Sequence, residues 1–245
     1  MPWTGAGWRR FVPQPTVQGR PRVKEFVREL PSTARWIDLG AGGRRLRDDV
    51  LRVDSAFGES AELVADGHRL PFRDSSLDSV VSTGTLEHVR EPATVLGEIR
   101  RVLRDGGLVY LEVPFLQGYH ADPDDYWRFT QNGLCLLLQQ GGFVVRESGA
   151  HMGPASGVCW IVSEVIASLF GEGRLHRAGL LLGRCLVWPL KFLDYGIMRL
   201  PGSARVASGV FAIGRKGSTV SRSQAAGLGE AGGESCLAPD SPVSS

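Results

Sequence analysis

The stretch WIDLGAGG, residues 36–43, is a short apolar run that passes directly into a glycine turn. This is typical of the first strand of an α/β sheet, where glycine lets the chain turn tightly. Similar runs recur along the chain and alternate with segments of helical spacing, over 21–30, 92–103 and after Thr130. We predict seven strands, over 35–39, 51–54, 62–65, 77–82, 108–113, 143–147 and 206–215. The pattern predicts an α/β, Rossmann-like fold: a seven-stranded, mostly parallel sheet with helices on both faces and a helical insertion before the last strand.

The length of 245 residues, of which 42% are hydrophobic, suits one sizeable domain. Residues 1–20 are rich in Pro, Gly, Trp and Arg and are predicted to form an arm. The domain is predicted over 21–216, with the helical insertion at about 150–205. Residues 217–245 carry few large apolar side chains, so we predict a disordered tail there.

The net charge of +2 excludes a strongly basic nucleic-acid binder by bulk charge, and no nucleic-acid partner is expected. The chain starts without the apolar core of a signal peptide and has no apolar stretch long enough to span a membrane. We therefore expect a cytoplasmic protein in a reducing compartment. Neither a zinc site nor a disulfide framework is predicted, because the four cysteines stand far apart: Cys135, Cys159, Cys185 and Cys236.

Acidic residues mark the ends of the first three predicted strands, at Asp38, Asp54 and Asp66. In an open α/β sheet, ligands bind beyond the carboxyl ends of the strands, so these carboxylates are predicted to rim one crevice. A dinucleotide site needs a third glycine at position 45, which is Arg45, and this disfavours the alternative of a dinucleotide oxidoreductase. A ligand with an ammonium group and ribose hydroxyls but no phosphate suits the acids better, and S-adenosylmethionine is such a ligand. The alternative is that the acids are merely solvated.

Three motifs, read together, resemble class I S-adenosylmethionine-dependent methyltransferases. They are DLGAGG (38–43), ADGHRLPFRDSSLDSVVSTGTLEHV (65–89) and EIRRVLRDGGLVYLEVP (98–114). The similarity is to the small-molecule type that includes the ubiquinone and menaquinone methylating enzymes. It covers residues 35–114 closely and extends more loosely to Arg215.

The resemblance implies S-adenosyl-L-methionine as the cofactor and assigns a role to each matching position. The methionine end would lie at Asp38, Gly40 and Gly42, and the ribose at Asp54. The adenine would meet Asp66 and the backbone of Gly67 and His68, and Thr83 would lie below the sulfonium. The chain departs from the family at Arg44, where a third alternate glycine is usual, and the short interval before Leu51 predicts that the first helix is cut short.

The loop after the fifth strand, FLQGYHADPDDYWRFT (115–130), lies where substrates enter such a fold. Its Y-H-x-x-P-x-D-Y-x-R-F-T pattern is similar to bacterial methyltransferases of cell-surface glycan and envelope assembly. We predict three catalytic residues, with His120 as the base that is aided by Asp125 or Tyr126. Arg128 would fix an anionic group or the loop. The alternative is an Asp125–Arg128 ion pair that only shapes a lid.

A second candidate for the chemistry is the Glu87-His88 pair after the fourth strand. In some quinone methyltransferases such a pair holds a metal together with a glutamate upstream, but the matching position here is Gly84. We therefore predict a structural role for the pair and no metal site. The less favoured alternative is a metal cluster formed by His120 and the acids of its loop, whose spacing matches no standard site.

Residues 158–200 form two apolar, Trp-bearing stretches dotted with Arg and Lys. We predict a helical cap over the substrate pocket; the alternative is a peripheral contact with the inner face of a membrane. The predicted function is O- or N-methylation of a small-molecule or saccharide-type, lipid-linked acceptor. The alternative function is a non-catalytic, methyltransferase-like protein at a membrane surface or in a scaffold. The oligomeric state is not predicted.

Overall fold

The computed structural model describes residues 22–56, 61–121, 123–200 and 202–217. The predicted arm over 1–20 lies outside the described residues, as does the predicted tail apart from Gly217. The predicted division into arm, domain and tail therefore stays a prediction.

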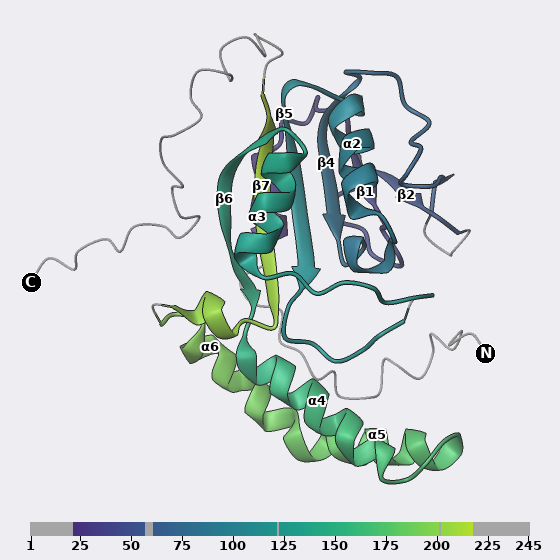
Figure 1. Cartoon of the computed structure of the whole chain (residues 1–245), viewed down its shortest axis with the longest axis vertical. Coiled ribbons are helices and arrows are strands. Elements are labelled where there is room, and N and C mark those ends of the chain that lie inside the picture. The colour runs from purple at the N-terminus through teal and green to yellow at the C-terminus, as the bar shows by residue number, and fades with distance from the viewer. Residues whose placement is uncertain (1–21, 57–60, 122, 201, 218–245) are drawn as a thin grey trace, which may run out of the picture.

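Seven strands form one sheet in the order β3-β2-β1-β4-β5-β7-β6. Strands β1 to β5 run parallel, and β7 is antiparallel to both of its neighbours, β5 and β6 (Figure 1). This confirms the predicted mostly parallel, seven-stranded α/β sheet. The strands are β1 Trp36–Leu39, β2 Leu51–Asp54, β3 Leu63–Val64, β4 Leu77–Thr83, β5 Leu103–Pro114, β6 Phe143–Met152 and β7 Gly209–Lys216.

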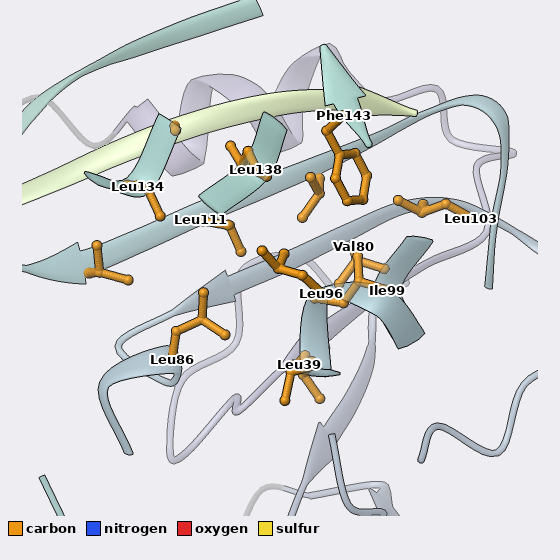
Figure 2. Packing of buried hydrophobic residues seen from close by; sticks show 14 of the residues in the cluster. Leu39, Val80, Leu86, Leu96, Ile99, Leu103, Leu111, Leu134, Leu138 and Phe143 are labelled. Carbon is orange, nitrogen blue, oxygen red and sulfur yellow. The ribbon is translucent and has the colours of Figure 1, made fainter. Parts of the chain in front are cut away.

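Helices cover both faces of the sheet. Because side chains alternate along each strand, successive strand residues pack against helices on opposite faces. In β4, Val80 belongs to the core under α2 (Pro92–Val102) and α3 (Gln131–Gln140), which includes Leu96, Ile99, Leu134 and Leu138 (Figure 2). The next residue, Val81, belongs to the core on the other face, together with Val23, Phe26 and Val27 of α1 (Arg22–Glu29). Both faces are thus buried, as expected for a parallel sheet.

Two local predictions are confirmed and one is wrong. Thr130 begins α3 by accepting a hydrogen bond from the Gly133 amide at 3.0 Å. The described chain between β1 and β2 contains turns and no helix, in keeping with the short interval before Leu51. The predicted start of the fifth strand at residue 108 is wrong, because β5 begins at Leu103, directly after α2. Gly106, with a positive φ of 76°, lies inside this strand and does not end a helix.

The insertion between β6 and β7 contains α4 (Pro154–Ser168), α5 (Arg174–Val187) and α6 (Asp194–Ile197). It also holds two short 3-10 helices, η3 (Trp188–Leu193) and η4 (Ser203–Val206). Figure 1 shows α4 and α5 side by side as a hairpin beyond one end of the sheet. No helix in the described part of the chain is long and apolar enough to cross a membrane.

Small residues lie between the two helices of the hairpin. A Cβ at Gly183 would lie 2.9 Å from the Ser163 Cα, and one at Gly179 would lie 3.0 Å from the Ala167 Cα. The helices therefore approach backbone to backbone. Large apolar side chains point outward instead, and the most exposed of them are Val158, Val165, Leu169, Leu175 and Leu186.

The buried Asp194 joins α6 to the start of α4, which follows directly after β6. Its carboxylate accepts hydrogen bonds from the amides of Ala155 and Ser156, both at 2.8 Å, and from the Ser156 hydroxyl at 2.6 Å. First-turn amides have no acceptor within their own helix, so Asp194 caps α4 from a distant element.

Candidate active site

A cavity of about 440 Å³ opens at the carboxyl ends of β4 and β5. This is the edge at which open α/β sheets bind ligands, and the volume suits a small molecule. The cavity is lined by residues of the turn after β1, of α1, of the last residues of β4, β5 and β6, and of the segments that follow β4 and β5. Its polar wall includes Thr83, Glu87, His88, Glu112, His120 and His151.

The glycine turn after β1 has the shape that the sequence predicts. Gly40 has a φ of 72°, and a Cβ there would collide with Thr85, so the position needs glycine. The Gly42 amide donates to Asp54 Oδ2 at 2.9 Å, while the Ser55 amide donates to Asp54 Oδ1 at 2.7 Å. The structure thus brings Gly40, Gly42 and Asp54 together, as predicted.

The carboxylate of Asp38 is fully buried and bound by Arg44. The guanidinium donates to both carboxylate oxygens, at 2.9 and 3.2 Å, and also to the Thr83 carbonyl at 3.3 Å. Burial raises the pKa of Asp38, and the Arg44 guanidinium opposes this shift. Arg44 therefore occupies the position that the resemblance gives to the ammonium group of the cofactor.

Asp66 and His68 lie on the loop after β3. The Asp66 carboxylate accepts from the His68 amide at 2.9 Å and contacts His68 Nδ1 at 2.7 Å. The hydrogen bond from that amide is the main reason why the pKa of Asp66 is lowered. Asp66, Gly67 and His68 do not line the cavity, whereas Thr83 does.

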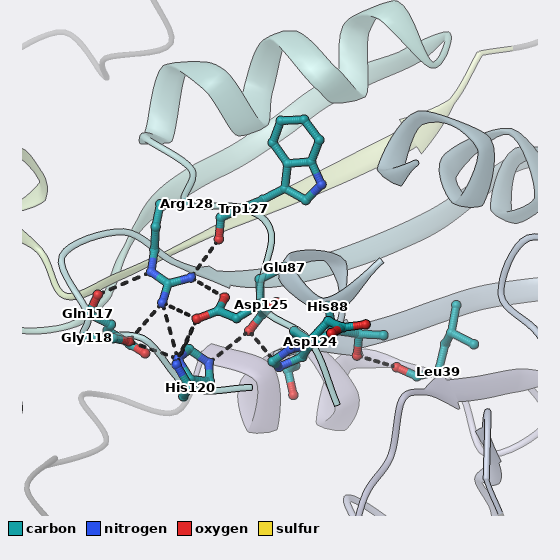
Figure 3. A network of polar contacts seen from close by, with 12 residues as sticks. Leu39, Glu87, His88, Gln117, Gly118, His120, Asp124, Asp125, Trp127 and Arg128 are labelled. Atoms are coloured by element: carbon teal, nitrogen blue, oxygen red, sulfur yellow. Dashed lines mark hydrogen bonds and ion pairs between the residues drawn. The ribbon is translucent and has the colours of Figure 1, made fainter. Parts of the chain in front are cut away.

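Asp125 and Arg128 form a pair that shapes the loop after β5. Arg128 donates to both oxygens of Asp125, at 2.5 and 2.6 Å, and to the carbonyls of Gln117 and Gly118 (Figure 3). Burial alone would raise the pKa of Asp125, but the Arg128 guanidinium and the His120 amide lower it to about 2. This geometry matches the alternative of an ion pair that holds the loop.

His120 is the catalytic candidate that lines the cavity. Its amide donates to Asp125 at 2.8 Å, and its Nε2 lies 3.7 Å from Glu87 Oε1. Burial alone would lower the pKa of His120, but interactions with Glu87 and the Gly118 carbonyl outweigh it, so the pKa is raised. Asp125 therefore positions the backbone of His120, while Glu87 faces its ring.

Tyr126 is not brought to the cavity. Its hydroxyl accepts from Arg90 Nε at 2.9 Å and donates to Asp124 at 2.8 Å, at the exposed side of the loop. The structure therefore separates Tyr126 from the other two catalytic candidates. The loop itself is tied to η2 (Leu86–His88), since the amide of Tyr126 donates to the Glu87 carbonyl at 2.8 Å.

The sequence did not point to one pair of neighbours in the cavity wall, an acidic residue and a histidine. Glu112 lies on β5 and His151 on β6, with 3.8 Å between Glu112 Oε2 and His151 Nδ1. Burial lowers the pKa of His151. A charged residue within the apolar run LVYLEVP was a signal for Glu112, whereas His151 carries none because antiparallel pairing through β7 brings it there.

The insertion does not close the cavity as a cap. No described residue of 158–200 lines it, and α4 reaches only the loop after β5, where the Trp160 ring lies 5.3 Å from that of His120. The helices pack behind the loop, which differs from the predicted cap.

A family model described as a methyltransferase domain matches residues 44–111. The matched segment runs from the turn before β2 into β5 and covers less than half of the chain. Among solved structures, the chain is similar to the 1,6-didemethyltoxoflavin-N1-methyltransferase of Burkholderia thailandensis, described with S-adenosylhomocysteine bound. The identity is 17%, with 81% of this chain and 78% of that chain covered and a TM-score of 0.50, which shows a shared fold.

Three curated relatives match shorter segments. A 37.1 kDa protein of transposon Tn4556 from Streptomyces fradiae is 43% identical, over 36% of this chain and 26% of its own length. An O-methyltransferase of Aspergillus nomiae is 32% identical over 37% of this chain and 44% of its own length. A tRNA (carboxymethyluridine(34)-5-O)-methyltransferase of Arabidopsis thaliana is 24% identical over 56% of this chain and 34% of its own length. The chain spans less than half the length of these relatives. The similarity to quinone-methylating enzymes stays a prediction.

Proposed function

We propose that this protein transfers the methyl group of S-adenosylmethionine to a small-molecule or saccharide-type acceptor. One observation carries the proposal: a glycine turn between the acids Asp38 and Asp54 adjoins a cavity at the carboxyl ends of β4 and β5. The matched methyltransferase domain and the shared fold support the same reading.

The residues of the turn fit the cofactor under one condition. Asp38 offers a buried carboxylate to a cationic group, and Asp54 offers carboxylate oxygens to hydroxyls beside a turn without side chains. Arg44 has to leave Asp38 before a ligand ammonium can bind there. This exchange is feasible because Arg44 lies on a turn and about a third of its side chain is exposed.

When bound, S-adenosylmethionine supplies an activated methyl carbon, so the protein mainly has to align the acceptor and help it lose a proton. His120 is the residue that serves this purpose, either as the base itself or through a cation that it binds. Asp125 and Arg128 position the loop that carries His120. Tyr126 has no part in the proposed chemistry.

The size of the cavity favours a small acceptor or one sugar unit of a larger one. The relatives' names include an O-methyltransferase and a tRNA methyltransferase, and an oxygen atom is the acceptor that we propose. A tRNA acceptor is disfavoured by the net charge of +2.

Asp54→Ala tests the cofactor site by calorimetry with S-adenosylhomocysteine. We expect the native protein to bind in the micromolar range, which corresponds to roughly 8 kcal/mol. The variant should lose about 1.5–3 kcal/mol of binding free energy, because charge-assisted hydrogen bonds to the ribose disappear. Asp48→Ala is the control, since the side chain of Asp48 is fully exposed.

Two results would contradict the proposal: tight binding of NAD, or an Asp54→Ala variant with unchanged affinity for S-adenosylhomocysteine. A native protein that binds neither nucleoside would instead support the non-catalytic alternative. Radiolabelled methyl transfer to extracts of lipid-linked sugars, small hydroxylated metabolites and tRNA would then identify the acceptor class.

A further inference from the structure

Three potential ligand atoms for a metal ion converge in the wall of the cavity. Glu87, His88 and His120 each offer one potential ligand atom, and these three atoms all lie within 4.8 Å of one another. Glu87 Oε1 is 3.9 Å from His88 Nε2 and 3.7 Å from His120 Nε2. Ligand atoms about 2.0–2.2 Å from a common metal ion are about 3–3.5 Å apart, so small side-chain rotations would bring these three to a metal.

The chain supplies the site from two segments that other contacts hold together. Glu87 and His88 belong to η2, and His120 comes from the loop after β5. The loop is fixed across η2 because its backbone amides donate to the Glu87 carbonyl and Trp127 Nε1 donates to the Val89 carbonyl at 2.9 Å. The convergence therefore does not depend on the three side chains themselves.

The hydrogen bonds of the two histidines involve their Nδ1 atoms, while each Nε2 faces Glu87 (Figure 3). His88 Nδ1 lies 2.5 Å from the Asp124 carbonyl, and His120 Nδ1 lies 3.1 Å from the Gly118 carbonyl. A carbonyl accepts and never donates, so each Nδ1 carries the hydrogen and each Nε2 carries the lone pair. His120 Nδ1 also lies 3.4 Å from an Arg128 nitrogen, but the carbonyl contact is the shorter one. Metal-binding histidines are typically oriented in this way by a carbonyl or carboxylate.

The carboxylate of Glu87 is buried with one of its oxygens unpaired among the described residues. The side chain is 2% exposed, yet its Oε2 has no hydrogen-bond partner among the described residues. Leaving a buried carboxylate oxygen unsatisfied is costly, and a cation in the cavity would remove that cost.

We propose that Glu87, His88 and His120 bind one divalent transition-metal ion, such as zinc. Two imidazoles and one carboxylate form the ligand set of open sites, in which a further position stays available to water or substrate. All three residues line the cavity. If the methyl transfer proposed above takes place here, an acceptor hydroxyl bound to the metal would release its proton to water more readily and so become the nucleophile. This role rests on the proposed function, whereas metal binding does not.

The test is metal binding by tag-free protein that has been freed of metal with a chelator, without cofactor or acceptor. Calorimetry with zinc chloride and the visible absorption of added Co²⁺ should show one ion per chain. His120→Ala and His88→Ala should each weaken binding at least 100-fold, since a direct ligand matters more than the orienting groups that typically contribute 10–100-fold. His176→Ala is the matched control, because His176 is similarly exposed but lies on α5, beside Glu164.

Circular dichroism shows whether each variant has folded, and Glu87→Gln is added because Glu87 is the buried ligand. Loss of binding in the folded His88 and His120 variants, with the His176 variant unchanged, supports the site. No uptake by the native protein, or equal uptake by all variants, overturns it. Because neither readout involves methyl transfer, failure of the metal site and failure of the proposed function are distinguishable.

Discussion

Asp38 is a buried carboxylate that pairs with the guanidinium of Arg44. Arg44→Gln should bind S-adenosylhomocysteine about tenfold more tightly, because the ligand ammonium no longer displaces a guanidinium; tenfold is about 1.4 kcal/mol. The free energy of unfolding of the ligand-free variant should be lower by about 1–2 kcal/mol, because Asp38 loses its partner. The loss is limited to this range because water screens the exposed part of Arg44. Calorimetry and urea unfolding measure the two effects.

Arg45→Gln is the control for this prediction, since Arg45 also lines the cavity but pairs with Glu62 and not with Asp38. Weaker binding by Arg44→Gln would contradict competition for Asp38 and would show that Arg44 contacts the bound ligand. Such a pairing was not predictable from sequence: Arg44 attracted attention as a missing glycine, whereas its contact with Asp38 depends on the path of the turn.

At the scale of elements, strands and helices with strong local signals were predictable and their lateral order was not. WIDL and LRVD read as strands because an apolar run and a turn are both local features. The start of β5 was not predictable, because Gly106-Gly107 also resembles the end of a helix. The cluster of Glu87, His88 and His120 escaped for a related reason: the loop that carries His120 crosses η2 only in the folded protein.

Asp194 provides a test at this scale, since one side chain joins α6 to the first turn of α4. Asp194→Ala should lower the free energy of unfolding by about 2–3 kcal/mol, because the amides of Ala155 and Ser156 and the Ser156 hydroxyl lose their acceptor. Asp194→Asn should lose less, since one carbonyl oxygen remains. Urea unfolding followed by circular dichroism gives both values. Equal midpoints for the native protein and Asp194→Ala would show that α4 does not need this cap.

For the whole molecule, we propose that the α4–α5 hairpin lies on an anionic membrane surface. Its helices pack through small residues and point large apolar side chains outward, an arrangement typical of helices in contact with lipid. Helix α5 carries Arg174, Arg177 and Arg184 and no acidic residue, which favours contact with an anionic surface. The protein should therefore sediment with vesicles that contain phosphatidylserine, and less with neutral vesicles.

Replacing Leu182 and Leu186 together with glutamate should reduce vesicle binding at least tenfold, because burial of each leucine contributes about 1.5–3 kcal/mol. Leu136→Glu is the matched control: Leu136 is 53% exposed, between the 47% of Leu182 and the 63% of Leu186, but lies on α3. Native protein that stays in the supernatant with every vesicle, or equal losses in the Leu136 variant, would contradict the proposal.

The place of β7 between β5 and β6 has a consequence for how the chain folds during translation. Among the described strands, β6 pairs only with β7, and β7 is the last to leave the ribosome. Until then β6 has no neighbour and the edge of β5 is open, although the helical hairpin has already been made. Pairing between strands so distant in the chain is slow, and an open strand edge exposed meanwhile invites aggregation. A nascent chain interrupted before Gly209 therefore lacks the strand that joins β6 to the rest of the sheet.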